Sequence, residues 1–402
     1  MKAVFNVSSV ASAPWSVLFL LGALVSCGAT NTSSTAEESA TVVPQVPAEG
    51  WNSAELDELL RWAHAAPEDA LPEPDIGELD ASIANGDQAA IDSAATALAL
   101  ELAHMHLLGV ATTAQRTGWR IEDSDASIDL ASRLTKAVAD GGIDAFFTAL
   151  RPSNPDYAAL RQAYATETDP ARRETIARNM ERWRWLPQSL GSSYVLVNTA
   201  TFEARLWRDG KMVGSWPVIV GKRSTPSPVF STTITGVVFN PWWEIPASIV
   251  REKKGRFPAR LGYVRTPEGR YRQKPGPNNA LGQMKLVMPN PFRVYMHDTP
   301  SKSLFEKDVR AFSHGCIRVG GALDYATTLL DGKESREQVD AIVASRKTTT
   351  VSLPRPVPVY ITYFTAGLLG DGSFVVMPDI YDRDARIGPL AQASESECSA
   401  SG

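Results

Sequence analysis

Residues 295–319 read YMHDTPSKSLFEKDVRAFSHGCIRV, and this stretch places Cys316 near two of the chain's five histidines, His297 and His314. A thiol attacks as its thiolate, and a neighbouring imidazole or a helix N-terminus lowers its pKa. A helical pattern begins a few residues after Cys316, so either influence could act on it. The stretch therefore suggests a nucleophilic cysteine, although residue types alone favour a buried, inert one.

The residues around Cys316 and His297 suit the same chemistry. Gly315 lets the backbone pass close to a substrate, and the amides of Gly315 and Cys316 can point at a developing oxyanion. Tyr295 lies two residues before His297, so both side chains project from one face of a strand. We therefore expect a catalytic site beside a β-strand.

Short alternating segments on both sides of this stretch predict further strands, with turn signals at Asp209-Gly210 and at Gly370-Asp371-Gly372. The expected strands are Tyr194–Asn198, Thr201–Trp207, Met212–Val220, Phe230–Asn240, Phe292–Met296, Val357–Phe364 and Ser373–Met377. The pattern from Ala322 to Leu330 predicts a helix that Gly332 ends. The second half of the chain is thus expected to be rich in β-structure.

Residues 241–282 interrupt this pattern with several prolines, many charges and little periodicity. A segment of this length without regular structure is usually a functional loop or lid. Trp242, Trp243 and Tyr263 give it aromatic surfaces that could close over a substrate. We expect a lid here.

Residues 51–186 favour helices. Asn52 and Glu55 have the spacing of a capping box, and an Ala/Leu pattern from Asp87 to Leu108 stops at Gly109. Further helix signals are Ser127–Ala139, Asn154 before Pro155, Asp169 before Pro170, and three histidines taken as structural, His64, His104 and His106. The fold class is therefore α+β, with a helical N-terminal domain before the β-rich one.

Charge divides along the chain. Residues 28–190 hold 26 acidic and 12 basic residues, a balance of −14, whereas residues 251–310 hold 14 basic and 5 acidic, a balance of +9. A basic stretch suits an acidic ligand, and a solvated surface is the alternative. The three cysteines, Cys27, Cys316 and Cys398, are too few for a disulfide framework, and no pair of them has zinc-site spacing.

The N-terminus has the pattern of a signal peptide. The apolar run Trp15–Val25 is too short to span a bilayer but suits the core of a signal peptide. It ends in Leu24-Val-Ser-Cys27, which resembles the lipobox of bacterial lipoproteins, with an ordinary cleaved signal as the alternative. We expect residues 1–26 to be removed and Cys27 to carry a lipid. By the same resemblance, Gly28 in place of Asp favours the outer membrane, facing the periplasm.

The motif around Cys316 resembles that of the L,D-transpeptidase family with its YkuD-type catalytic domain. That signature is a histidine, a short spacer, and then Ser/Thr-His-Gly-Cys-hydrophobic-Asn/Arg; here positions 298–312 separate His297 from Ser313. The Arg318 form is similar to the large periplasmic branch of Gram-negative bacteria. Other stretches similar to that branch are Met180–Pro187, Asn240–Pro246, Pro275–Gly282, Asp379–Tyr381 and, in its scaffold domain, Leu150–Tyr157.

This resemblance implies the roles of individual residues. Cys316 would be the nucleophile and His297 the base, with Asp298 orienting the histidine ring through its backbone carbonyl. The expected oxyanion and supporting residues are Ser313, His314 and Gly315, and the expected substrate contacts are Tyr295, Trp243 and Arg318. Arg318 would hold a carboxylate either of the stem or of the protein itself.

The resemblance also implies the reaction. Cys316 would form a thioester with a peptidoglycan tetrapeptide stem and release D-Ala, and a diaminopimelate amine would complete a 3-3 cross-link. It implies no metal, organic cofactor or nucleic acid. One departure is the short Tyr164–Asn179 segment, which leaves no room for the peptidoglycan-binding module that branch members often carry.

Domain boundaries follow from these patterns. The expected parts are a lipoprotein signal peptide at 1–26, a disordered linker at 27–50, a helical scaffold domain at 51–186, a catalytic domain at 187–385 with its lid at about 241–282, and a polar tail at 386–402 that holds an incidental Cys398.

Three alternatives remain open. Water as acceptor would give an L,D-carboxypeptidase or endopeptidase, and a protein lysine would give a protein-attaching enzyme. A lipid-anchored scaffold that only binds peptidoglycan would have no need of the intact motif. A zinc site made of His297, His314 and Cys316 lacks a convincing fourth ligand or carboxylate base.

Overall fold

The computed structural model describes residues 50–388. Cys27, the signal peptide, nearly all of the linker, most of the polar tail and Cys398 lie outside the described residues, so what the sequence indicates there stays a prediction. Between residues 50 and 388, no helix is both long enough and apolar enough to cross a membrane.

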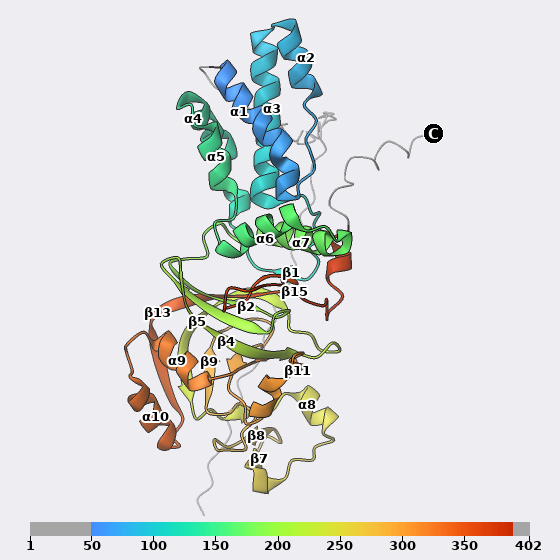
Figure 1. The fold of residues 1–402 in the computed structure, drawn as a ribbon. Helices are drawn as coiled ribbons and strands as arrows, with labels where there is room; N and C mark the ends of the chain where they lie inside the picture. The colour runs from blue at the N-terminus through green and yellow to red at the C-terminus, as the bar shows by residue number, and fades with distance from the viewer. Residues whose placement is uncertain (1–49, 389–402) are drawn as a thin grey trace, which may run out of the picture. The chain divides into compact units, whose positions relative to one another are not determined.

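Five helices at the start of the described chain share one apolar core, which includes Leu59, Leu102 and Phe147 (Figure 1). They are Ser53–Ala65 (α1), Gly77–Asn85 (α2), Gln88–Leu108 (α3), Leu130–Ala139 (α4) and Ile143–Leu150 (α5). The predicted capping box at Asn52 is present, and α3 ends before Gly109 as expected. The short helices α2 and α5 were not predicted from the sequence.

The next two helices, Pro155–Thr166 (α6) and Pro170–Trp183 (α7), start at the predicted caps Asn154 and Asp169. Their buried side chains share a core with the sheet that follows and not with α1–α5. The Trp183 ring, for example, stacks on Phe364 at 4.8 Å between centroids. The helices therefore divide between two apolar cores, and Ala70, Ala111 and Ile121 also belong to the core that α6 and α7 share with the sheet.

One ten-stranded sheet forms the second half of the fold, in the order β1-β5-β13-β2-β3-β4-β12-β10-β9 with β11 beside β4. Because β9 also pairs with β5, the path from β5 to β9 closes on itself. The strands are Trp119–Arg120 (β1), Ser193–Asn198 (β2), Glu203–Arg208 (β3), Lys211–Gly221 (β4), Val229–Phe239 (β5), Met284–Val287 (β9), Met296–His297 (β10), Ala311–Ser313 (β11), Ile317–Val319 (β12) and Thr349–Thr362 (β13).

Two predicted strands differ from the structure. The segment predicted as Phe292–Met296 is a strand only at β10, because Arg293 has a φ of 57° and the Asn290 side chain bonds to Val294, which together make a turn. The hairpin predicted to join Val357–Phe364 to Ser373–Met377 through the Gly370–Gly372 turn forms with a different first strand. Its first strand is Ala366–Leu368 (β14) and its second Phe374–Val376 (β15), and neither pairs with β13.

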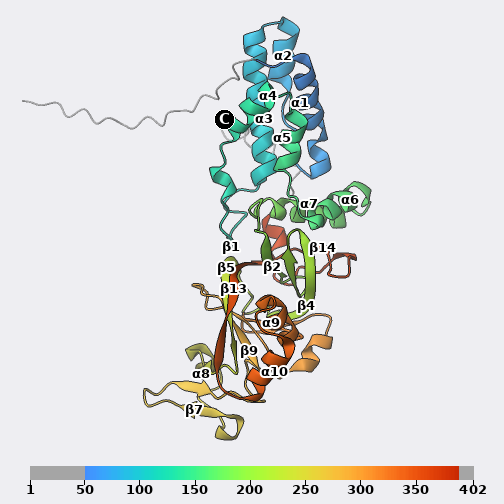
Figure 2. The ribbon, with the colours of Figure 1, turned by 90° about the vertical axis from the view of Figure 1, so that its left-hand side faces the viewer.

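The predicted lid has regular structure, contrary to expectation. It contains Trp243–Glu244 (β6), Ala247–Glu252 (α8), Tyr263–Arg265 (β7) and Tyr271–Gln273 (β8), whose strands form a separate sheet in the order β6-β8-β7. Of these elements, α8 and β7 are labelled in Figure 2. A small core of Trp243, Ile245 and Leu281 holds the lid together. These elements are too short to show a periodicity in the sequence.

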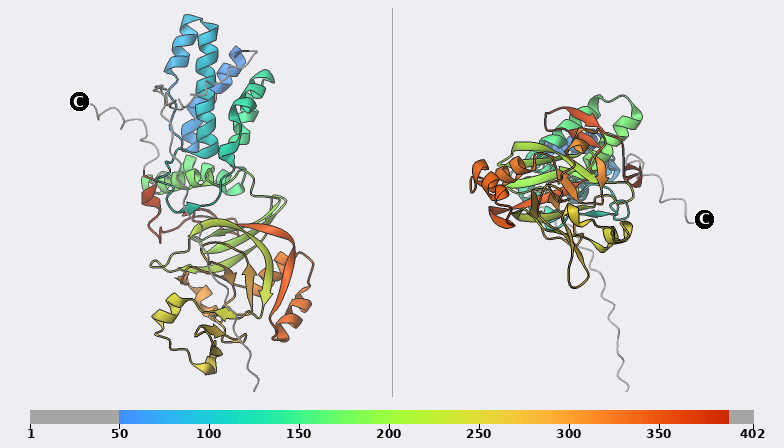
Figure 3. Two further views of the ribbon diagram at one scale, coloured as in Figure 1. Left: turned by 180° about the vertical axis from the view of Figure 1, so that it is seen from behind. Right: turned by 90° about the horizontal axis from the view of Figure 1, so that it is seen from below.

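The remaining helices are the predicted Ala322–Leu330 (α9) and the unpredicted Arg336–Ala344 (α10), which contact each other beside the sheet (Figure 3). Single 3₁₀ turns occur at Ala66–Asp69, Asp125–Ser127, Ala259–Leu261, Lys302–Glu306 and Asp384–Arg386. The helical first part and the sheet of the second part make this an α+β fold, as predicted.

Candidate active site

Cys316 lies in the connection between β11 and β12, and Ser313 fixes that connection. The Ser313 hydroxyl accepts the Gly315 amide at 3.0 Å and donates to the Cys316 carbonyl at 2.5 Å. Gly315 has a φ of 110°, a conformation that suits glycine and allows the tight path. The nucleophile loop, defined as residues 313–316, is thus shaped by a serine of its own motif.

The thiol of Cys316 is protonated at neutral pH, contrary to the expectation of a lowered pKa. Burial raises its pKa, while hydrogen bonds from Tyr295 and the positive charges of Lys285 and Arg318 act in the opposite direction. The predicted helix after Cys316 is α9, which starts at Ala322, after β12 in the chain.

His297 is neutral for a related reason. Burial lowers its pKa to about 3, and the nearby Arg318 guanidinium contributes in the same direction. Its Nδ1 contacts the Asp298 carbonyl, which can only accept, and the Leu281 backbone also bonds to the ring. A proton on Nδ1 satisfies the Asp298 carbonyl and leaves the lone pair on Nε2. The Asp298 carboxylate is turned elsewhere, to the Gln283 amide at 2.8 Å and to Lys302.

Strand register brings the candidate residues to one face. In the parallel pair β10–β12, His297 lies opposite Arg318, and the Ile317 amide donates to the Tyr295 carbonyl. Residues two apart share a face, so Cys316 lies beside Tyr295 and diagonally across from His297. Within residues 50–388, the thiol and the imidazole form no hydrogen bond with each other; the acceptor recorded for Sγ is the Arg293 carbonyl at 3.9 Å.

Tyr295 connects the thiol to the lid. Its pKa is raised by burial, and its hydroxyl bonds to the side chains of Trp243 and Cys316. The Tyr295 and His297 rings are 5.5 Å apart, and the Lys285 ammonium lies 4.7 Å from the centre of the Tyr295 ring. Tyr295 and Trp243, both predicted as substrate contacts, therefore lie against the nucleophile.

Two of the predicted oxyanion residues, His314 and Gly315, form other contacts in the structure. The His314 Nε2 lies 2.7 Å from Glu252 at the end of α8. The Gly315 amide is already bonded to the Ser313 hydroxyl. The Cys316 amide is the predicted donor that these contacts leave available.

Two half-buried cations flank this face. The buried Arg318 Nε has no hydrogen-bond partner among the described residues. Burial lowers the pKa of Arg318, and a thiolate at Cys316 would act in the opposite direction. Lys285 on β9 pairs with His297 across the strands and rests on the Tyr295 ring. Lys285 was missed in the sequence. The only signal for it in the sequence is the alternation of apolar and polar residues at Met284, Lys285 and Leu286, which places Lys285 on the opposite face of the strand from its neighbours.

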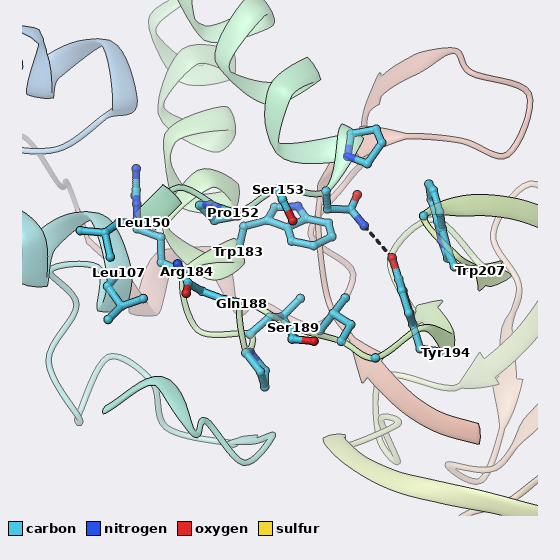
Figure 4. A pocket seen from close by; sticks show the side chains of 17 residues that line it. Leu107, Leu150, Pro152, Ser153, Trp183, Arg184, Gln188, Ser189, Tyr194 and Trp207 are labelled. Atoms are coloured by element: carbon cyan, nitrogen blue, oxygen red, sulfur yellow. Dashed lines mark hydrogen bonds between the residues drawn. The ribbon is translucent and has the colours of Figure 1, made fainter. Parts of the chain in front are cut away.

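Other hollows and clusters in residues 50–388 lack the chemistry of this face. No three histidine, cysteine or acidic side chains of that range lie close enough to hold a metal ion. A cavity of about 220 Å³ lies where α7 leads into β2, and the Asn154 amide donates to the Tyr194 hydroxyl at its wall (Figure 4). Its lining has one cation, Arg184, which is paired with Glu181, and it includes no thiol or imidazole.

The sequence of this domain matches a family model described as the L,D-transpeptidase catalytic domain, YkuD, over residues 192–353. The domain belongs to the L,D-transpeptidase family. A second model, described as a Scaffold domain, matches residues 34–163, which include α1–α5 and most of α6. The predicted resemblance to the branch with an N-terminal scaffold is therefore confirmed.

One curated relative of this chain is a Haemophilus influenzae protein whose assignment as an L,D-transpeptidase is provisional. It is 31% identical over 242 residues, which cover 53% of this chain and 49% of the relative. The chain thus matches about half the length of that relative.

Solved structures of L,D-transpeptidases are also similar. One from Mycobacterium smegmatis is 16% identical with a TM-score of 0.24, covering 42% of this chain and 58% of that one. L,D-transpeptidase 3 from Mycobacterium tuberculosis is 16% identical with a TM-score of 0.25, covering 42% and 61%. The family assignment rests on the sequence matches and not on these superpositions.

Proposed function

We propose that this transpeptidase domain forms a Cys316 thioester with a peptidoglycan tetrapeptide stem and transfers it to a diaminopimelate amine, giving a 3-3 cross-link. The observation that carries the proposal is the pair of half-buried cations, Arg318 and Lys285, on the same face as the thiol. A buried cation without a carboxylate partner is costly unless a ligand supplies one. Stem peptides are rich in carboxylates, and Arg318 suits bidentate binding of one.

The first half-reaction starts from a neutral pair. Nε2 of His297 takes the Cys316 proton as the sulfur attacks the carbonyl between the third residue, an L-centre, and the terminal D-Ala. The S–C bond forms, and the Cys316 amide donates to the oxyanion. The C–N bond then breaks, and D-Ala leaves with the proton that His297 returns.

The second half-reaction reverses these roles. The amine of another stem attacks the thioester carbonyl and gives its proton to His297, which returns it to the departing Cys316 sulfur. A C–N bond replaces the C–S bond, so the enzyme is regenerated without a cofactor. Water or a protein lysine would resolve the same thioester, giving hydrolysis or protein attachment instead.

The test is mass spectrometry of sacculi after incubation with the enzyme. We expect dimers joined through two diaminopimelate residues with wild type and none with Cys316→Ala. Arg336→Gln is a matched control, because Arg336 is an exposed arginine on α10, paired with Asp324 and Asp340. Stems shortened by one residue without dimers would instead indicate a carboxypeptidase.

We also propose that the protein is a lipoprotein that faces the periplasm, held on the outer membrane by a lipid on Cys27. The lipobox-like Leu24-Val-Ser-Cys27 sequence supports the lipid anchor, and Gly28 after it supports the outer membrane. A palmitate analogue should label the wild-type protein in cells and fail to label Cys27→Ser. Labelling that persists in Cys27→Ser would contradict the anchor and leave the thioester proposal untouched.

A further inference from the structure

The turn between β4 and β5 lies directly behind the nucleophile loop, and its central side chain is Ser227. Ser227 is fully buried. Its hydroxyl donates to the Gly315 carbonyl at 2.8 Å and accepts the Gly221 amide at 3.0 Å. A Cβ on Gly221 would lie 2.2 Å from the Thr225 carbonyl, so the turn can close this tightly only with glycine there.

The bond from Ser227 fixes the direction of the Cys316 amide. In a trans peptide the C=O and the following N–H point in opposite directions. Because the Gly315 carbonyl points at Ser227, the Cys316 N–H points away from the turn and toward the open side of the loop. The same turn holds the Ser313 carbonyl through the Lys222 amide at 2.9 Å.

The chain's C-terminal segment holds the other side of this turn. The Arg383 guanidinium donates to the Ser227 carbonyl at 2.9 Å, and the Tyr381 hydroxyl donates to the Gly221 carbonyl at 2.5 Å. Arg383 also lies over the rings of Tyr363 and Tyr381, at 4.9 and 4.8 Å from their centres. The turn is therefore clamped between the nucleophile loop and residues 381–383.

This segment is in turn anchored to helix α7. Asp384 forms an ion pair with Arg182 at 2.6 Å, and both side chains are almost fully buried. The Thr365 hydroxyl donates to Asp384 at 2.9 Å, and the Asn179 side chain bonds to Thr365. Contacts thus run without a break from α7, through the C-terminal segment and Ser227, to the peptide that carries the oxyanion donor.

We propose that Ser227 is a positioning residue that aims the Cys316 amide at the oxyanion, and that Arg383 holds Ser227 in place for this task. The proposal rests on the proposed thioester function and extends it to residues outside the signature motif. It also gives α7 a role in catalysis, through the Asp384 ion pair, in addition to its role in packing.

Two reagents separate aiming of the amide from general damage to the site. Iodoacetamide alkylates a thiol by direct displacement and forms no oxyanion, whereas p-nitrophenyl acetate acylates it through a tetrahedral intermediate that does. Both reactions are followed on the full chain by mass spectrometry of the peptide that contains Cys316. Neither reagent is a stem peptide, so the result does not depend on the natural substrate.

For Ser227→Ala we expect acylation to slow about 10- to 100-fold, less than the loss of a whole oxyanion donor, while alkylation stays within twofold of wild type. Arg383→Gln keeps the Ser227 hydroxyl and should slow acylation about 3- to 10-fold with alkylation unchanged. This variant tests the contact of Arg383 with the turn even if Ser227→Ala does not fold. The control is Thr233→Ala, an exposed threonine on β5, which should change neither rate.

Equal slowing of both reactions in the folded variants would overturn the proposal, because the loop would then have lost its shape as a whole. Unchanged acylation would overturn it too. If wild type is acylated by the ester but not by a tetrapeptide stem, the proposed function fails while the role of Ser227 still stands on the ratio of the two rates.

Discussion

His106 in helix α3 and His297 in strand β10 are both buried, and burial lowers the pKa of each to about 3. Their contacts differ. His106 packs edge-on against Trp62, with ring centres 5.4 Å apart, and neither ring nitrogen has a partner among the described residues. His297 donates to a backbone carbonyl and shares a strand face with a thiol. The shared pKa therefore reports burial, and only the contacts distinguish a base from a packing residue.

Two arginines, Arg184 and Arg318, show the same contrast between a residue of the packing and a residue of the catalytic face. Arg184 is fully buried, and its guanidinium bonds to the Asp69 carbonyl, the Tyr157 hydroxyl and Glu181. Arg318 is less buried. The Nε of both arginines lacks a hydrogen-bond partner within residues 50–388, but no ion pair forms between the Arg318 guanidinium and the residues of that range. The helical part thus satisfies the charge of Arg184 with its own groups, whereas the catalytic face leaves Arg318 for a ligand.

The largest expected effect separates the two histidines. His297→Ala should slow acylation of Cys316 by a stem peptide about 10²- to 10⁴-fold, the range for loss of a general base. His106→Leu should leave that rate within twofold, because the ring makes no polar contact that catalysis could use. Rapid-quench measurement of the acyl-enzyme checks both variants, and a large loss in His106→Leu would break the comparison.

Substitution of Arg184 should affect mainly the stability of the protein, and substitution of Arg318 mainly the binding of the donor stem. Arg184→Gln leaves Glu181 buried without its partner and should lower the free energy of unfolding by about 3–5 kcal/mol. Arg318→Gln should change stability little but raise the KM for a tetrapeptide donor about 10- to 100-fold, from the loss of one charged hydrogen bond. Urea unfolding and steady-state kinetics measure the two. The reverse pattern would contradict the assignment of Arg318 to a ligand.

Acid stability tests the buried histidines. Each pKa is lowered in the folded state, so the stability it contributes is complete above pH 6.5 and is lost as the pH falls toward 3, by about 1.4 kcal/mol per pH unit. His106→Phe removes one of these two groups and should therefore reduce the loss of stability between pH 7 and 4.5 by about 2–3 kcal/mol. Urea midpoints at both pH values check this. If His106→Phe lost as much stability between pH 7 and 4.5 as the wild type, His106 would be protonated in the folded protein at pH 4.5.

The smallest effect concerns the thiol. Burial raises the Cys316 pKa, so the midpoint of its alkylation by iodoacetamide against pH should lie above that of a free cysteine, whose pKa is about 8.5. Lys285→Gln removes a charge that favours the thiolate and should slow alkylation at pH 8 about two- to fivefold. The control, Lys136→Gln on the exposed face of α4, should change nothing. Faster alkylation in Lys285→Gln would contradict the role given to Lys285.

Local signals in the sequence predicted much of the fold. The caps at Asn52, Asn154 and Asp169 and the turn at Asp209-Gly210 act over a few residues, and the structure has each of them. Short elements were missed where tertiary contacts decide the conformation. The strands of the lid are too brief to leave a pattern, and Asn290 replaces the start of a predicted strand with a turn.

The site shows the same limit. The spacing of the motif identified Cys316 and His297 as candidates, but their protonation depends on burial, which the motif does not encode. The pairing of β9 with β10 brings Lys285 to this face, and no local pattern reveals that pairing. Ser227 and Arg383 lie far from Cys316 along the chain, one on each side of it, and only the fold brings them to its loop.

The central claim is that Cys316, although neutral at rest, takes the acyl group of a carboxylate-bearing stem. Its most direct test is mass spectrometry of the enzyme, rapidly quenched in acid after mixing with a tetrapeptide stem and no acceptor. The account predicts the mass of the stem less D-Ala on the peptide that contains Cys316, with one D-Ala released for each acyl group. Release of D-Ala at the wild-type rate by Cys316→Ala would contradict it.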